Sequence, residues 1–131
     1  MASYISSRAF IWHNVTIGEH AFILEDNTLQ PFVSIGDNVT LWSGNHIGHS
    51  SKIADHCFIA SQVVISGLCE IGARSFVGVN ATFAEGSKIA EDNFIGMGCI
   101  VPRTTEPDDL FLPVKSEAKA NAAKKYYKVE E

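Results

Sequence analysis

The central part of the chain reads, from residue 35 to residue 65, IGDNVT LWSGNH IGHSSK IADHCF IASQVV I, with an aliphatic residue at the head of every group of six. An apolar residue keeps this spacing without a miss from residue 5 to residue 101. The positions are Ile5, Ile11, Ile17, Ile23, Leu29, Ile35, Leu41, Ile47, Ile53, Ile59, Ile65, Ile71, Val77, Phe83, Ile89, Ile95 and Val101. Four residues after each stands a second, mostly small residue, so each hexad has one large and one small inward position.

A period of six fits neither the 3.6-residue period of a helix nor the simple alternation of an isolated strand. It does fit short strands separated by tight corners, three of which make a triangular coil of 18 residues in a hexapeptide-repeat β-helix. Residues 18 apart then lie over one another at roughly 4.8 Å, the spacing of paired strands. The sequence therefore predicts an all-β parallel β-helix of about five coils.

The repeat ends at Pro102, which divides the chain into a β-helix over residues 1–102 and a C-terminal part over residues 103–131. Residues 103–114 contain two prolines and are expected to form a connecting loop. Ser116 and Glu117 place a hydroxyl and an acid where a helix begins, and the alanine-rich residues 118–125 follow. We therefore expect one short C-terminal helix.

The composition narrows the class of protein. The 131 residues are 46% hydrophobic, which is enough for the core of one domain, and the net charge of -5 argues against nucleic acid or an anionic membrane as the partner. No apolar run is long enough to span a membrane, and residues 1–4 do not begin a signal peptide, so a cytoplasmic protein is expected. A narrow prism with flat, partly apolar flanks favours oligomerisation.

Five hexads begin with Ile-Gly, at residues 17, 35, 47, 71 and 95, and this pattern resembles the hexapeptide-repeat acyltransferases. The run LWSGNHIGH, residues 41–49, is similar to the sugar acetyltransferases related to sialic acid O-acetyltransferase and bacillosamine N-acetyltransferase. The resemblance implies a left-handed coil and a homotrimer that binds acetyl-CoA in the cleft between subunits. It also implies a preceding nucleotide-sugar-binding βαβ domain, for which these residues leave no room.

One outward column of the predicted prism places a histidine beside a glycine. The column runs His13, Pro31, His49, Gly67, Glu85 and Arg103. An imidazole suits a general base at neutral pH, and the backbone N–H of a bare glycine one strand away suits the oxyanion of a tetrahedral intermediate. The resemblance assigns the same two roles, the base to His49 and the carbonyl-binding amide to Gly67.

The partner that orients His49 is open at this point. Many relatives have an acidic residue directly after the base, where Ser50 stands here. The nearest candidates are Asn45 and His46. Asn45 also lies one coil after Asn27, both at small interior positions, where stacked amides favour a structural ladder.

A second column, formed by Trp42, Ala60, Gly78 and Gly96, loses side-chain bulk along the axis. It predicts either a trough for the pantetheine arm of acetyl-CoA or a surface for close subunit approach. Arg103 and Lys115 are the basic residues that we expect near the coenzyme. For Lys115 and the other tail lysines, the alternative is a solvated helix face.

The leading hypothesis is an acetyl-CoA-dependent acetyltransferase acting on an amino or hydroxyl group of a sugar. We expect this sugar to be nucleotide-linked and used in cell-surface polysaccharide synthesis. No metal is expected. The three cysteines, Cys57, Cys69 and Cys99, occupy small interior positions and are interpreted as packed thiols, which favours direct transfer. Two alternatives stay open: a non-catalytic assembly module, and a zinc carbonic anhydrase-like trimer, although the histidines do not form facing columns.

Overall fold

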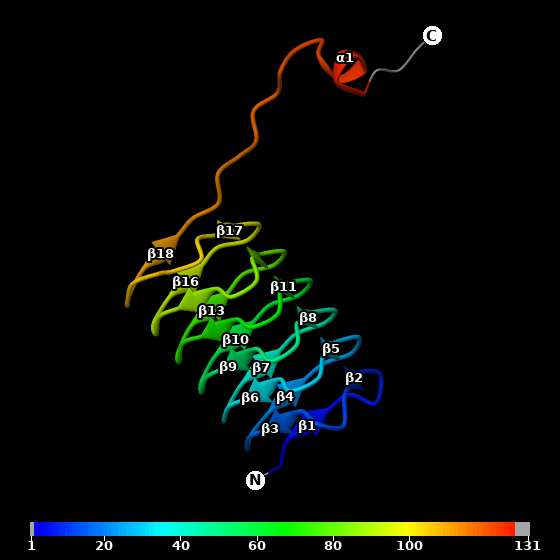
Figure 1. Ribbon diagram of the computed structural model, residues 1–131, viewed down its shortest axis with the longest axis vertical. Coiled ribbons are helices and arrows are strands. Elements are labelled where there is room, and N and C mark those ends of the chain that lie inside the picture. The colour runs from blue at the N-terminus through cyan, green and yellow to red at the C-terminus, as the bar shows by residue number, and fades with distance from the viewer. Residues whose placement is uncertain (1, 128–131) are drawn as a thin grey trace.

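The computed structural model describes residues 2–127, and they form a left-handed parallel β-helix followed by an extended tail and a short helix (Figure 1). The strands lie in three flat sheets that make the sides of a triangular prism. The predicted all-β fold is confirmed. The prism has about six turns, one more than expected, because a strand after residue 102 adds a last rung.

Each sheet takes every third strand of the chain as far as β17, and β18 then joins the sheet of β16. The seven-stranded face contains β1 (Tyr4–Ile5), β4 (Phe22–Ile23), β7 (Thr40–Leu41), β10 (Phe58–Ile59), β13 (Phe76–Val77), β16 (Phe94–Ile95) and β18 (Leu110–Phe111). The six-stranded face contains β2 (Phe10–Ile11), β5 (Thr28–Leu29), β8 (His46–Ile47), β11 (Val64–Ile65), β14 (Thr82–Phe83) and β17 (Ile100–Val101). The five-stranded face contains β3 (Thr16–Ile17), β6 (Ser34–Ile35), β9 (Lys52–Ile53), β12 (Glu70–Ile71) and β15 (Lys88–Ile89).

The register of the sheets follows the hexads. Ile47 of β8 pairs with Ile65 of β11 and with Leu29 of β5, so residues 18 apart stack through most of the prism. The second residue of each strand points inward, and from Ile23 to Ile95 these residues are at most 4% exposed. Phe83 is the largest side chain in this core and is fully buried.

The corners between the strands share one backbone conformation. From Ile17 to Ile95, the third residue after each inward apolar residue has a positive φ, for example 58° at Ser50, 61° at Leu68 and 72° at Gly44. Most of these positions are not glycine, so the tertiary structure holds side chains in a left-handed conformation that local preference disfavours. The chain therefore turns by the same amount at every corner, which keeps the columns on the outside aligned.

The small inward positions are filled as the sequence predicted, but the asparagines do not form a ladder. Asn27 and Asn45 both donate their side-chain N–H to the backbone oxygen of Trp42, at 2.6 and 3.0 Å. The Asn45 Oδ1 accepts the N–H of Val63 at 2.8 Å. The two amides thus bind the backbone of neighbouring coils and not each other.

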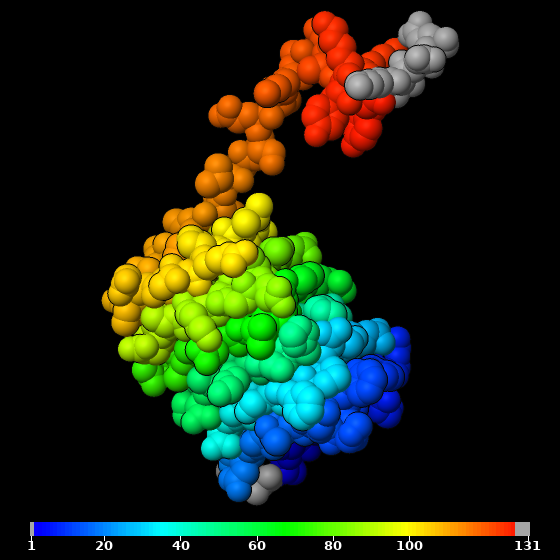
Figure 2. Space-filling view, in the orientation of Figure 1, coloured from blue at the N-terminus to red at the C-terminus, as the bar shows by residue number. Residues whose placement is uncertain are grey.

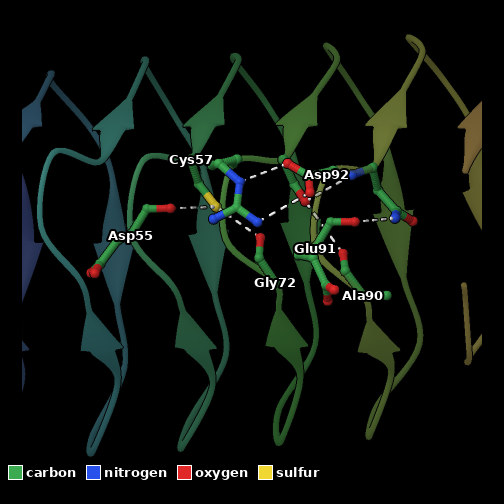
Figure 3. A network of polar contacts seen from close by, with 9 residues as sticks. Asp55, Cys57, Gly72, Ala90, Glu91 and Asp92 are labelled. Carbon is green, nitrogen blue, oxygen red and sulfur yellow. Dashed lines mark hydrogen bonds and ion pairs between the residues drawn. The ribbon is translucent and has the colours of Figure 1, made fainter. Parts of the chain in front are cut away.

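The cysteines pack inside the coils. Cys57 is 2% exposed, and its thiol donates to the backbone oxygen of Gly72 at 3.1 Å (Figure 3). Cys69 is fully buried, and its thiol donates to the backbone oxygen of Ala84 at 3.2 Å. Burial raises the pKa of the Cys57 thiol, which disfavours a reactive thiolate. This agrees with the interpretation of these residues as packed thiols.

The last coil is two residues shorter than the others. Lys88 forms a bridge with Thr104, and Phe94 pairs with Leu110, so residues 16 apart lie together here. The loop expected over residues 103–114 therefore contains β18 and continues the seven-stranded face. The shorter coil also moves Arg103 out of the column of His49, because the backbone oxygen of Arg103 accepts the N–H of Lys88. The placement of Arg103 in that column was wrong.

The tail leaves the prism as a narrow arm (Figures 1 and 2). The predicted helix is present but shorter: α1 spans Ala123–Tyr127, and residues 112–119 have no regular structure. The capping residues Ser116 and Glu117 therefore start no helix. Within residues 2–127, no helix has the length and apolarity that crossing a membrane requires.

Candidate active site

His49 lies on the corner that joins the six-stranded face to the five-stranded face, two residues after the end of β8. Its side chain is 51% exposed and extends along the prism toward the next coil. Gly67 occupies the equivalent corner position there. A Cβ on Gly67 would overlap the imidazole, at 2.7 Å from Cδ2 and 2.9 Å from Cε1. The His49 ring thus occupies the space that a side chain at position 67 would fill.

The backbone N–H of Gly67 has no hydrogen-bond acceptor among the described residues. Equivalent corner amides elsewhere bind oxygen atoms from the coil above: Glu19 N–H donates to Asp37 Oδ1 at 2.8 Å, and Asp37 N–H donates to Asp55 Oδ1 at 2.7 Å. A corner amide at this position is therefore directed toward a place that an anionic oxygen can occupy. At Gly67 that place is open to a substrate oxygen.

Gly48, next to His49, keeps the same amide accessible. A Cβ at position 48 would lie 2.5 Å from the Gly67 nitrogen and 2.6 Å from the backbone carbon of Ser66. Glycine at both positions allows the two coils to approach closely, with no side chain between the imidazole and the amide. The two groups that the sequence predicted to act together are adjacent.

A carboxylate lies on the far side of Gly67 from His49. The Glu85 Oε1 is 3.7 Å from the His49 Nε2, and the Glu85 side chain is 63% exposed. Glu85 belongs to the same predicted column, but it was not predicted as a partner of His49. The signal was present: a long acidic side chain stands 36 residues after the histidine, with only a glycine between them in the column.

The predicted orienting partners, Asn45 and His46, make no hydrogen bond to the His49 side chain. Asn45 is 1% exposed, and its amide binds the backbone of neighbouring coils. His46 is the outward residue of β8 and pairs in register with Thr28 and Val64. The orienting role of Asn45 is therefore incompatible with its position inside the prism.

The predicted coenzyme column lies on a different side of the prism from His49. Ala60, Gly78 and Gly96 follow strands of the seven-stranded face and are buried. A Cβ on Gly78 would lie 2.7 Å from the Met97 nitrogen, and one on Gly96 would lie 2.9 Å from the Pro113 Cδ. The small residues thus allow close stacking of the backbone, and the tail partly covers the upper end of the column.

The structure does not bring the two predicted basic contacts to the His49 corner. Arg103 is exposed on the shortened last coil, and Lys115 is exposed on the tail. Neither residue forms an ion pair within residues 2–127. The site within one chain therefore consists of His49, Gly67 and Glu85, with Gly48 beside them.

The five-stranded face beside this corner is charged. Lys88 Nζ binds Glu70 Oε2 at 2.9 Å, and this contact lowers the pKa of the Glu70 carboxyl. Lys52 precedes Glu70 in the same column, and a shallow groove of about 410 Å³ runs between this column and Gly36 and Gly72. Among residues 2–127, no three His, Cys, Asp or Glu side chains are grouped to hold a metal ion.

The comparisons with known proteins agree with this fold. Residues 32–67 match the family described as bacterial transferase hexapeptide (six repeats), and this segment ends at Gly67 and contains His49. The chain is a hexapeptide-repeat β-helix. The predicted resemblance to hexapeptide-repeat acyltransferases is confirmed by this match and by the structural similarities. No curated protein matches the chain in sequence.

Among solved structures, the hexapeptide-repeat chain is similar to two from Caulobacter crescentus. One is a point mutant of perosamine N-acetyltransferase from that organism with CoA and GDP-perosamine, at a TM-score of 0.81, 23% identity, and coverage of 89% of this chain and 56% of that chain. The other is PerB with the same two ligands, at a TM-score of 0.80, 26% identity, and coverage of 88% and 56%.

A third similar structure is the acetyltransferase domain of PglB from Neisseria gonorrhoeae with acetyl coenzyme A, at a TM-score of 0.79 and 18% identity. The match covers 83% of this chain and 53% of that one. The hexapeptide-repeat chain thus spans little more than half the length of these three structures. They establish the fold that it shares with these acetyltransferases.

Proposed function

We propose that the hexapeptide-repeat chain is an acetyl-CoA-dependent acetyltransferase that acts on an amino or hydroxyl group of a sugar. The observation that carries the proposal is the position of the His49 imidazole against Gly67, whose N–H has no acceptor within residues 2–127. A base beside an unoccupied amide suits acyl transfer, which needs one group to remove a proton and another to stabilise an oxyanion.

In the proposed reaction, the lone pair of the acceptor nitrogen or oxygen attacks the thioester carbonyl carbon while His49 takes the acceptor proton. The carbonyl oxygen becomes negative in the tetrahedral intermediate and accepts the N–H of Gly67. The C–S bond then breaks, and the CoA thiolate leaves and is protonated by the imidazolium. No acyl-cysteine is needed, which agrees with the burial of Cys57 and Cys69.

The similar structures support the substrate classes. Perosamine N-acetyltransferase was solved with CoA and GDP-perosamine, and the PglB domain with acetyl coenzyme A. We propose acetyl-CoA as the co-substrate and a nucleotide-linked amino sugar of cell-surface polysaccharide synthesis as the acceptor. No metal takes part in the proposed reaction.

The surface of the prism supports a homotrimer with its sites at the seams. The seven-stranded face carries the stacked rings of Phe58, Phe76 and Phe94, with centroids 5.4 and 4.8 Å apart. Phe94 is 45% exposed, and on the six-stranded face Val64 is 42% exposed. Exposed apolar faces of this kind mark association surfaces. Packing the two apolar faces of neighbouring copies leaves the charged face in water and puts His49 at the edge of each seam.

A seam between two copies would also bring together His49 and the proposed coenzyme residues, which lie apart within one chain. Ala60, Gly78 and Gly96 lie on the seven-stranded face, away from the His49 corner of the same chain. Contact between the six-stranded face of one copy and the seven-stranded face of the next brings one copy's His49 toward the other's small-residue column. We propose that the pantetheine arm lies there, with Arg103 and Lys115 near its phosphates.

Turnover by a His49→Ala variant tests the proposal. The purified protein is incubated with acetyl-CoA and a panel of nucleotide-linked amino sugars, and the acetylated product is measured by mass spectrometry. General-base catalysis contributes about 10² to 10⁴ in rate, so His49→Ala should lose at least about two decades of turnover and still bind acetyl-CoA. His56→Ala, on another corner, is the matched control and should keep full turnover. Near-normal turnover by His49→Ala would remove the assignment.

A non-catalytic assembly module is the second candidate. The fold also matches the CcmM N-terminal domain in complex with CcmN, at a TM-score of 0.61 and 20% identity, over 97% of that chain and 76% of this one. Titration calorimetry with acetyl-CoA separates the two candidates. The transferase should give saturable binding, whereas an assembly module should give none.

A further inference from the structure

Glu85 and His49 are brought together by the repeat although 36 residues separate them. Both occupy the same corner position, two coils apart, and Gly67 lies between them. The Glu85 Oε1 lies 3.7 Å from the His49 Nε2. It is the only carboxylate oxygen within 4 Å of a nitrogen of this ring in the described part of the chain.

Acidic residues at this corner position have another role elsewhere in the prism. Asp37 and Asp55 each accept the corner N–H of the coil below, at 2.8 and 2.7 Å. Glu85 stands at the equivalent position above Gly67, but it makes no hydrogen bond to the Gly67 amide. Its carboxylate faces the histidine beyond the glycine. The carboxylate is thus available to His49 while the amide stays available to a substrate.

The contact involves one particular ring nitrogen. Nε2 is the ring nitrogen that faces Glu85, and the imidazole makes no hydrogen bond within residues 2–127. The ring nitrogen that faces a carboxylate carries the proton, which leaves the lone pair on the other nitrogen. A carboxylate at Nε2 therefore favours the tautomer in which Nδ1 is the basic atom.

We propose that Glu85 is the positioning residue of His49, holding the imidazole over Gly67 with the proton on Nε2, so that Nδ1 receives the acceptor proton. The inference rests on the proposed function for the role of that proton. The tautomer itself is a property of the resting protein and is measured without turnover. Glu85 thus provides the acidic group that many relatives carry directly after the base, where this chain has Ser50.

The test combines nitrogen NMR with kinetics on the full chain. Long-range ¹H–¹⁵N spectra of the wild type should show the Nε2–H tautomer for the ring whose signals vanish in His49→Ala. Glu85→Ala and Glu85→Gln should shift these signals toward a mixture of tautomers. Glu91→Gln, at the same hexad position on another corner, should leave them unchanged. A wild-type ring with its proton on Nδ1, or unchanged His49 signals in Glu85→Ala, would overturn the proposal.

Kinetics give a second, independent readout. Glu85 positions the imidazole, so its removal should lower kcat and leave the KM for acetyl-CoA unchanged. The loss in kcat should be about two- to fivefold, as for a half-exposed charge pair. The nearby cations Lys52 and Lys88 stay in place in all variants, and Lys88 is already paired with Glu70. A raised KM for acetyl-CoA with an unchanged kcat would contradict the positioning role. Full turnover by His49→Ala would instead reject the proposed mechanism, whatever the tautomer.

Discussion

The His49 imidazole fills the space beside the bare Cα of Gly67, on the neighbouring coil of the same corner. The contact exists because each coil repeats the last with the same corner conformation, so that two residues 18 apart are held side by side. It places a titratable ring beside an amide whose N–H no described residue accepts.

Gly67→Ala should separate catalysis from folding. The added methyl group meets the tip of the His49 ring, which can swing away, so the melting temperature should stay near that of the wild type. A displacement of about 1 Å at a catalytic group costs about 10² in rate, and we expect a loss of that order in kcat. The double variant with His49→Ala should lose little beyond His49→Ala alone. Additive losses would show that the two residues do not act together.

Asn45→Ala should lower stability without a specific effect on catalysis. The substitution leaves the Val63 N–H without its acceptor and removes a donor from the Trp42 carbonyl, at a cost of about 2–4 kcal/mol in the free energy of unfolding. Denaturant titration measures this loss. Turnover per folded molecule should stay within about threefold of the wild type, because the amide does not reach His49. A stable but inactive variant would contradict this structural role.

Phe94→Lys should separate the subunits of the proposed trimer. The substitution introduces a charge into the aromatic stack of the seven-stranded face. In this stack the ring centroids of Phe94 and Phe76 are 4.8 Å apart. The buried seam would not tolerate an unpaired ammonium group. Analytical ultracentrifugation should show a smaller species than the wild type. Lys52→Gln, on the charged five-stranded face, is the control and should leave the mass unchanged. A wild-type mass equal to that of one chain would reject the trimer.

Asp92→Asn should change the dependence of stability on pH. Two hydrogen bonds from Arg74 lower the pKa of the Asp92 carboxyl in the folded protein (Figure 3). A carboxyl with a depressed folded pKa stabilises the protein above the pKa of the unfolded chain, about 3.9, and the effect disappears as pH falls through the folded value. The variant should therefore melt below the wild type at pH 7, and the two should converge near pH 2. Glu117→Gln in the tail should show no such difference.

Much of the fold could be predicted because one rule repeats along the chain. The inward positions, the 18-residue stacking and the pairing of His49 with Gly67 all follow from the hexad spacing. The shortened last coil could not be predicted, because the repeat stops at Pro102 and only the pairing of Lys88 with Thr104 reveals the new register. The early start assigned to the helix failed for a related reason. A local capping pattern at Ser116 has no packed surface beside it.

The sequence by itself determined the triangular coil, the identity of the residues inside it and the column that holds the histidine and the glycine, because side chains that must be buried recur with a fixed period. Only the tertiary structure decided where the polar side chains point, inside the prism and on its surface. It turned the amide of Asn45 to the backbone inside the prism and left Glu85 facing His49 across Gly67. The period fixes where each Cα lies, whereas the direction of a polar side chain depends on which donors and acceptors neighbouring coils leave unpaired.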